Sequence, residues 1–494
     1  MEIKEKDYEN LAKEEFYEVI QMFILPLLNT SGNLKLVDEE SENNDWVKFI
    51  NVDRNGKSVV RFYPCRKKKG INSSPFYCEI NTFSTISMQK PLNRIMDELM
   101  KVTEYSVIGH KIKKQRDYGK KTPKGNAYKK RVLSLAFEVG MSLWVTERNE
   151  NAITFYSVLC KMIDWSSKTY EGKRVPFGIV IDFNRTADEN AISYVNFLDN
   201  NSSAVFSDGI FSGILLDKEG KLLSFITRNT PSAEMESKQE IFTPFKYIEL
   251  ARHCCNKAVG IIVQPNGEIL IIKNRSICFA KRGEKWIAFD WSRLYIKLRP
   301  YFLVNTENLS PKELQTKEHE AESNIKKIYC TLLDVSFSHT GGCLAIILPD
   351  VLDNNISKVI KERIDISLKG TLTGISKESQ ERIEVLKHFL KDDGNGTKSF
   401  FDIDKELRSE ILSLDGATVV ALDGSFYCAG SIVSVASGSS GGGRTAAAKH
   451  LAEFGVGIKI SEDGDIEAFG KPIGDVVQSD DKKGDRIIRL FSFK

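Results

Sequence analysis

The chain has 494 residues, enough for about three domains of ordinary size. Hydrophobic residues make up 41% and charged residues 28%, which excludes a disordered or collagen-like chain. Because 70 Lys and Arg stand against 67 Asp and Glu, the formal charge is only +3, which excludes nucleic-acid binding through the overall charge. Any cationic surface must therefore be local.

The cysteines and the apolar runs indicate the compartment. Nine cysteines are scattered without a Cys-x-x-Cys pair, and six histidines are too dispersed for a zinc site of the usual spacing. This pattern is typical of reduced thiols in a reducing cytosol. The longest apolar run near the start, Met22 to Leu28, contains Pro26 and is too short for a membrane span or a signal peptide. We therefore expect a cytoplasmic protein with no membrane partner.

Residues 1–150 are expected to form an N-terminal α+β region with a basic loop. Between residues 7 and 25 the apolar positions recur about every 3.6 residues, which predicts an amphipathic helix. The most basic stretch of the chain, residues 111–131, contains ten Lys or Arg and one acid, Asp117. Such a stretch is typical of a solvated loop, and also of a loop that binds the phosphates of a nucleic acid or nucleotide. Both interpretations stay open.

Residues 151–310 are expected to form a sheet-rich domain. Two hairpins are predicted in it, formed by strands 213–216 and 222–226 and by strands 258–263 and 269–272. Asn266-Gly267, between the second pair, is the strongest short hairpin signal. The polar stretch 305–323 predicts a linker that continues as a solvated helix, so we place a domain boundary there.

Residues 325–494 alternate apolar strands with helical patterns, which predicts a third, α/β domain. In chain order we expect a strand at 343–348, helices at 376–391 and 404–412, a strand at 417–422, a turn at 423–424 and a returning strand, a helix at 445–454, and strands at 456–460 and 466–469. The expected fold class of the whole chain is α/β (α+β), with a C-terminal mixed sheet flanked by helices, preceded by sheet-rich and helical N-terminal domains.

The segment from Ser437 to Arg444 contains three consecutive glycines and leads directly into an alanine-rich helix. Glycines let the backbone approach a ligand closely, and the start of a helix offers unpaired N–H groups and a positive dipole end. These are the features of a phosphate-binding loop, and Arg444 would add a planar guanidinium for phosphate oxygens. No Gly-Lys-Ser/Thr follows, so this is not a Walker loop. A surface turn is the alternative interpretation.

An acid, Asp415, stands just before the strand predicted at 417–422. A carboxylate at the end of a strand that faces a phosphate-binding loop can hold a divalent cation and help to prepare an attacking hydroxyl. The alternative is that Asp415 only shapes a turn.

Four motifs follow one another in this C-terminal region: Asp415-Gly416-Ala417, Asp423-Gly424, Gly-Gly-Arg-Thr-Ala-Ala-Ala at 442–448, and Ser461-Glu462-Asp463-Gly464. In their order and spacing they resemble the diadenylate cyclase domain, the nucleotide-binding domain of the DNA integrity scanning protein. The resemblance covers about residues 325–494. It implies that two domains meet face to face, each with one ATP, and that the 3′-hydroxyl of each ATP attacks the α-phosphate of the other. The products would be cyclic di-AMP and pyrophosphate, the cofactor Mg²⁺ or Mn²⁺, and the assembly a homo-oligomer formed through the C-terminal domain.

The resemblance also implies roles for individual residues. Asp415 resembles the metal-binding acid that positions the hydroxyl, and Glu462 resembles a second acid near the metal. Arg444 resembles a catalytic residue at the start of the phosphate-binding motif. The expected nucleotide contacts are Gly416, Ala417, Gly441, Gly442, Gly443, Thr445 and Lys449.

One departure from the family pattern matters for activity. The usual Arg-His-Arg falls on Arg444-Thr445-Ala446, so an imidazole and one guanidinium are missing. Each lost charged hydrogen bond costs about 1.5–3 kcal/mol, which slows a reaction on the order of ten- to a hundredfold or more. Lys449 and His450, about one turn further along the helix, could supply charge instead.

Three hypotheses follow. The first is a nucleotidyltransferase that is regulated by the N-terminal region, whose residues 151–310 resemble the sensor-like segments found before diadenylate cyclase domains. The second is a catalytically degenerate sensor or effector that binds ATP or a cyclic dinucleotide. The third is a nucleic-acid-associated scaffold that uses residues 111–131.

Overall fold

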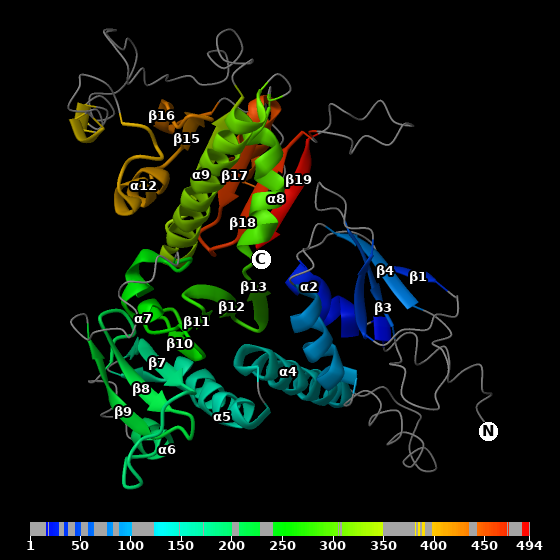
Figure 1. The fold of residues 1–494 in the computed structure, drawn as a ribbon, viewed down its shortest axis with the longest axis vertical. Helices are drawn as coiled ribbons and strands as arrows, with labels where there is room; N and C mark the ends of the chain where they lie inside the picture. Colours follow the sequence, from blue (N-terminus) through cyan, green and yellow to red (C-terminus); the bar gives the residue numbers. More distant parts are fainter. Residues whose placement is uncertain are drawn as a thin grey trace. The chain divides into compact units, whose positions relative to one another are not determined.

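The computed structural model forms two compact units. The N-terminal unit holds residues 1–241 and 247–289, and the C-terminal unit holds residues 242–246 and 290–494. Helices and three larger mixed or antiparallel sheets confirm the expected α+β class (Figure 1). The structure describes residues 16–17, 19–28, 34–37, 45–50, 58–63, 77–82, 88–100, 123–147, 149–170, 172–199, 207–227, 241–304, 306, 309–348, 381, 384–385, 388–390, 398–433, 442–471, 473 and 487–493.

The N-terminal unit begins with a short helical segment and an antiparallel sheet. The π-helical turn η1 (Ile20–Ile24) and α2 (Leu25–Leu28) overlap the end of the expected opening helix, whose residues 7–15 lie outside the described part. The sheet has the strand order β1-β4-β3-β2. Its strands are β1 (Lys35–Val37), β2 (Val47–Ile50), β3 (Ser58–Phe62) and β4 (Tyr77–Thr82).

Helix α4 (Pro123–Thr146) corrects the expected extent of the basic loop. Residues 123–131 are helical rather than loop, and residues 111–122 lie outside the described part. The helix begins at Pro123 because proline already has a helical φ and lacks only an N–H that the first helical turn leaves unpaired. The phosphate-binding interpretation of the basic stretch stays a prediction.

A second, seven-stranded sheet follows, with the order β13-β12-β11-β10-β7-β8-β9. Strands β7 and β8 are parallel and the other neighbours are antiparallel. Both predicted hairpins are confirmed, as β8–β9 and β10–β11. In chain order the elements are α5 (Asn149–Ser166), β5 (Thr169–Tyr170), β6 (Lys173–Arg174), β7 (Phe177–Asp182), α6 (Tyr194–Leu198), β8 (Ser212–Asp217), β9 (Leu222–Thr227), α7 (Ile248–Arg252), β10 (Ala258–Val263), β11 (Ile269–Lys273), β12 (Ser276–Arg282) and β13 (Lys285–Ala288).

One hydrophobic core runs through the N-terminal unit. It extends from Phe16 and Ile20, through Val60 and Phe62 of the first sheet, to Phe279 of the second. This continuous core joins the two regions that the sequence analysis divides at residue 150.

The C-terminal unit is built on a six-stranded mixed sheet with the order β16-β15-β14-β17-β18-β19. Strands β14 and β15 are parallel and the other neighbours are antiparallel. The expected strands and the helices at 404–412 and 445–454 are confirmed within a few residues, whereas most of the helix expected at 376–391 lies outside the described part. The elements are α8 (Trp291–Phe302), α9 (Pro311–Ser338), β14 (Gly342–Ile347), α12 (Lys405–Leu412), β15 (Ala417–Ala421), β16 (Phe426–Ser431), α13 (Gly443–Leu451), η6 (Ala452–Phe454), β17 (Gly455–Ile460), β18 (Ile466–Gly470) and β19 (Ile488–Phe493).

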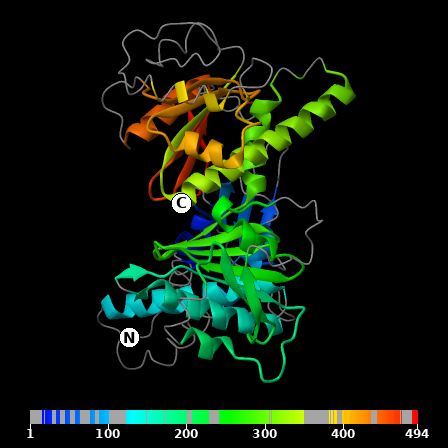
Figure 2. The ribbon, with the colours of Figure 1, turned by 90° about the vertical axis from the view of Figure 1, so that its left-hand side faces the viewer.

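Local signals fix where the helices of this unit begin. The side chains of Ser310 and Glu313 form a capping box, and Pro311 is the first helical residue, so α9 begins inside the stretch expected as a linker. Helices α8 and α9 pack against each other and lie against the C-terminal sheet (Figures 1 and 2). The short helix α13 packs on β17 and β14.

The described part also bears on thiols and membranes. Its eight cysteines are all free, in keeping with the expected reduced thiols. Among the helices described, none has the length and apolar character needed to cross a bilayer.

Candidate functional site

The predicted site residues lie on segments that meet at one edge of the C-terminal sheet. This edge is formed by the ends of neighbouring strands and not by an outer strand. The parallel strands β14 and β15 both begin at this edge, and β17 ends there because it runs antiparallel to β14. Asp415 stands just before β15, and Glu462 lies in the turn that follows β17. Arg444 is in the first turn of α13 and contacts Glu462 directly. The two predicted metal-binding acids and the predicted catalytic arginine therefore share one edge.

Arg444 is held by two other segments of the chain. Its Nη1 donates a hydrogen bond to Glu462 Oε1 at 2.9 Å. The guanidinium also lies against Gly341, where a Cβ would come within 2.5 Å of Nη1 and the backbone φ is +71°. The left-handed φ favours glycine at position 341, and its missing side chain leaves room for the Arg444 guanidinium.

The Arg444–Glu462 pair is accessible to solvent, with 29% of the arginine side chain and 71% of the glutamate side chain exposed. Exposed ion pairs contribute only about 0.2–1 kcal/mol. A phosphate group, which accepts two parallel hydrogen bonds from a guanidinium, can therefore compete with Glu462 for Arg444.

Asp415 is exposed at the start of β15. A hydrogen bond of 2.7 Å between the hydroxyls of Thr340 and Ser413 joins the segment that enters β14 to the segment that enters β15. Gly416 follows with a φ of +103°, and a Cβ there would lie 2.6 Å from the carbonyl carbon of Gly430. The chain can therefore make this turn into β15 only with glycine, which leaves the carboxylate of Asp415 in solvent.

The remaining predicted nucleotide contacts differ in how they are placed. Gly442 and Gly443 face open space at the start of α13, which no side chain caps among the described residues. Thr445 and Ala417 are buried, with 7% and 0% of their surface exposed, so neither side chain is open to a ligand. Gly441 lies outside the described residues, as do residues 437–440.

Lys449 and His450, suggested as substitutes for the missing charges, make other contacts. The Lys449 amino group lies 5.5 Å from the centre of the Phe469 ring. His450 Nδ1 is 3.7 Å from a carboxylate oxygen of Glu453. These contacts are made near the carboxyl end of α13, whereas Arg444 is at its amino end.

Sequence reasoning missed two residues at this edge. His339 ends α9 with a left-handed φ of 57°, and its Nδ1 is 2.8 Å from the backbone oxygen of Glu462. Gly341 contacts the Arg444 guanidinium. The one sequence signal for this position is Gly341-Gly342 between a helix and a buried strand, a pair that allows close approach of another segment.

The carboxylates at this edge are the possible ligands of the expected Mg²⁺ or Mn²⁺. In the part of the chain that the structure describes, no three His, Cys, Asp or Glu side chains converge as a metal-binding group. Mg²⁺ is usually held by one or two carboxylates together with water and substrate phosphates. Asp415 and Glu462 supply two carboxylates at this edge, on segments next to β15 and β17, which is the number that such a site needs beside the phosphates of a nucleotide.

The buried thiols behind the edge do not join this chemistry. Burial raises the pKa of Cys343 to about 12 and that of Cys428 to about 11. Both thiols are therefore neutral at physiological pH and are poor nucleophiles and metal ligands.

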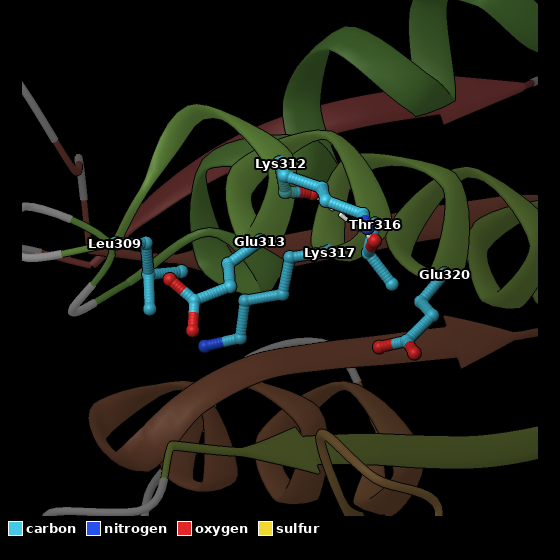
Figure 3. A pocket seen from close by; sticks show the side chains of 6 residues that line it. All are labelled: Leu309, Lys312, Glu313, Thr316, Lys317 and Glu320. Carbon is cyan, nitrogen blue, oxygen red and sulfur yellow. Dashed lines mark hydrogen bonds between the residues drawn. The ribbon is translucent and has the colours of Figure 1, made fainter.

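Two surface hollows lie away from this edge. One, of about 330 Å³, is lined by Leu309 and by side chains from the first turns of α9 (Figure 3). The other, of about 380 Å³, lies in the N-terminal unit, and two lysines and two glutamates contribute to its lining: Lys218, Lys257, Glu150 and Glu219. Neither contains a predicted site residue.

A scan against models of protein families gives no match to the chain, and a search among curated proteins also gives none.

Proposed function

We propose that the C-terminal unit is a nucleotidyltransferase domain that resembles diadenylate cyclases. It condenses two ATP into a cyclic dinucleotide, cyclic di-AMP, with release of pyrophosphate, and the N-terminal unit regulates it in the cytoplasm. The observation that carries this proposal is the meeting of Arg444, Glu462 and the Asp415 segment at one sheet edge.

In the proposed reaction each residue has a distinct task. Arg444 exchanges Glu462 for the phosphate oxygens of ATP, and the first N–H groups of α13 receive a further phosphate. Asp415 faces solvent at the same edge and would position the attacking hydroxyl. When bound by Asp415 and Glu462, Mg²⁺ or Mn²⁺ would neutralise the charge that develops on the phosphates.

Nucleotide binding without turnover is the second candidate. A specific observation favours it, because the positions that follow Arg444 carry a buried threonine and a buried alanine in place of a histidine and an arginine. The transition state would then lack two charged contacts that the family supplies. Such a domain would bind ATP or a cyclic dinucleotide through Arg444 and report occupancy.

The test is to incubate the purified chain with each nucleoside triphosphate and Mn²⁺, measure pyrophosphate and identify products by mass spectrometry. We expect a cyclic dinucleotide from ATP, lost in Asp415→Ala and retained in the control Asp423→Asn. Asp423 lies in the turn after β15, and its side chain accepts a hydrogen bond from Ser425 N. Binding of ATP that weakens in Arg444→Ala, without product, would favour the second candidate. No binding of any nucleotide contradicts both.

A further inference from the structure

The seven-stranded sheet of the N-terminal unit and the sheet of the C-terminal unit have the same topology. Six strands of the first, in the order β9-β8-β7-β10-β11-β12, correspond to β16-β15-β14-β17-β18-β19 of the second. In each sheet the first two of these strands along the chain are parallel, and all the other neighbours are antiparallel. A long helix precedes the first strand, a short helix joins the first two strands, and another precedes the fourth.

The register of the strands is also the same. Strand β7 pairs with β10 from Phe177↔Val263 to Asp182↔Ala258. Strand β14 pairs with β17 from Gly342↔Ile460 to Ile347↔Gly455. In both cases the whole of the first strand faces the whole of the fourth, end to end.

The turns agree in detail. The turn after the fourth strand is Gln264–Glu268 in one sheet and Ser461–Asp465 in the other. Its glycine has a φ of +87° at Gly267 and +84° at Gly464. In both turns the backbone N–H of the first residue donates to the backbone oxygen of the fifth, at 2.8 Å in the first sheet and 2.9 Å in the second. The backbone N–H of the glycine donates to the backbone oxygen of the first residue, again at 2.8 Å and 2.9 Å. Agreement in topology, register and turn conformation identifies two copies of one fold in this chain.

The register shows which residues of the first copy correspond to the candidate site. Ile214 pairs with the third residue of β7, and Thr418 pairs with the third residue of β14, so Ile214 and Thr418 are equivalent. Counting back the same number of residues from each, Phe211 corresponds to Asp415. Pro265 is the second residue of its turn, as Glu462 is. Tyr247 precedes β10 by as many residues as Arg444 precedes β17. All three charges of the candidate site are therefore missing from the first copy.

The corresponding edge of the first copy is also closed by its own side chains. The Tyr247 hydroxyl donates to Gln264 Oε1 at 3.0 Å, and Gln264 Nε2 donates to Glu268 Oε2 at 3.1 Å. Arg282 Nε is 3.1 Å from Glu268 Oε1, and 9% of each of these two side chains is exposed. Helix α7 has only five residues, against nine in α13. A buried polar chain thus lies where the second copy presents Arg444.

Asp208-Gly209, which matches Asp415-Gly416 in sequence, is not a substitute. Its carboxylate accepts hydrogen bonds from the backbone N–H groups of Ile210, Phe211 and Ser212 at 2.8–2.9 Å. Partial burial opposes ionisation, but these hydrogen bonds outweigh it and hold the pKa of Asp208 below its usual value. Asp208 therefore shapes the turn into β8.

From this comparison we propose that the first copy is closed to nucleotides and that each chain binds one nucleotide, in its C-terminal unit. The identity of that nucleotide rests on the proposed function. The partner is then a second copy of this chain, because a reaction that joins two ATP requires the C-terminal units of two chains. The first copy cannot supply the second ATP.

The test is the binding stoichiometry of the full chain for a non-hydrolysable ATP analogue with Mn²⁺, measured by calorimetry and by native mass spectrometry. We expect one analogue per chain. Arg444→Ala should weaken binding at least tenfold, because it removes the guanidinium. The matched variant in the first copy, Tyr247→Phe, removes the hydroxyl that binds Gln264 and should leave the stoichiometry and affinity unchanged.

Two analogues per chain would overturn the inference and leave nucleotide binding intact. So would one analogue whose affinity depends on Tyr247 and not on Arg444. Absence of binding would overturn the proposed function together with the one-nucleotide count, so the two failures are distinguishable.

Discussion

At the scale of single residues, the central feature is the contact between Arg444 and Glu462. The same carboxylate is expected to pair with the arginine in the free protein and to assist the metal in the loaded one. These two tasks exclude each other at one moment, because the guanidinium must leave Glu462 to bind phosphate. Under the proposed function, Glu462 should therefore lower the affinity for a nucleotide without metal and raise it with metal.

This argument predicts the behaviour of Glu462→Gln. Without divalent metal, its affinity for ATP should rise by a factor of about 1.4 to 5, which corresponds to an exposed ion pair of about 0.2–1 kcal/mol. With Mn²⁺ its affinity should fall below that of the wild type. Fluorescence titration with a labelled ATP analogue, with and without Mn²⁺, measures both effects.

Asp463→Asn is the control, since Asp463 is exposed in the same turn and the change in charge is equal. It should leave the metal dependence of binding unchanged. If both variants behave alike, the effect is one of net charge, and the specific role of Glu462 is wrong.

The site could be predicted in part from the sequence. The resemblance and the motif spacing indicated Asp415, Arg444 and Glu462, which the register of three strands brings to one edge. Lys449 contacts the ring of Phe469, which is in β18. The sequence around Lys449 does not reveal that β18 lies near α13. His339 lies more than a hundred residues before Glu462, so no local motif could join the two.

At the scale of elements, a polar network ties α9 to α12 within the C-terminal unit. Asp334 of α9 accepts hydrogen bonds from Phe245 N and, at 3.2 Å, from the Ser409 hydroxyl. Lys405 Nζ is 3.4 Å from its carboxylate and donates to Thr243 O at 2.9 Å. Since α12 leads directly to Ser413 and Asp415, this network supports the segment that carries the candidate metal-binding acid.

The network makes stability dependent on pH. Burial, partly offset by Lys405 and the hydrogen bonds, raises the pKa of Asp334 to about 6 from its ordinary 3.8. A carboxyl whose pKa is raised by folding stabilises the fold most at low pH, and this contribution is lost as the pH rises through 6. The loss is on the order of 3 kcal/mol.

Asp334→Asn should remove this pH dependence, because an amide does not titrate. The difference in free energy of unfolding between wild type and variant should therefore change between about pH 4 and pH 7, to the disadvantage of the wild type. Urea denaturation of both proteins across this range measures it. A difference that stays constant with pH would contradict the shifted pKa, whatever the absolute stability of the variant.

The two hairpins and the helices expected at 404–412 and 445–454 were the elements that local sequence predicted well, because signals such as Asn266-Gly267 act within a few residues. The starts of α4 and α9 were not predicted, since they lie in stretches expected as a loop and a linker. The relation between the two sheets could not be predicted in this way, because it lies in strand order and register. The matching dipeptides Asp208-Gly209 and Asp415-Gly416 would align Asp415 with Asp208, whereas the strand register makes Phe211 the counterpart of Asp415.

At the scale of the whole molecule, the chain contains one fold twice, with different surfaces at the same edge. In the first copy this edge is closed by Tyr247, Gln264, Glu268 and Arg282, which stabilise it without a ligand. In the second copy the edge presents an exposed ion pair and open glycines. A nucleotide should therefore stabilise only one of the two units.

Ligand-induced stabilisation follows from mass action. A ligand at a hundred times its dissociation constant adds about 2.7 kcal/mol to the unit that binds it, which for a unit of this size raises its unfolding temperature by about 5–10 °C. Scanning calorimetry of the full chain with an ATP analogue and Mn²⁺ should show this shift for the C-terminal unit alone, and Arg444→Ala should abolish it.

Hydrogen exchange assigns the stabilised unit. With the analogue bound, the amides at the start of α13 and in the turn 461–465 should exchange more slowly, because their segments meet at the edge that holds Arg444. The amides of the corresponding turn 264–268 should be unaffected, since that edge is already closed by buried hydrogen bonds. Equal slowing in both turns would mean that the first copy also binds nucleotide, in spite of the phenylalanine, tyrosine and proline that replace its charges.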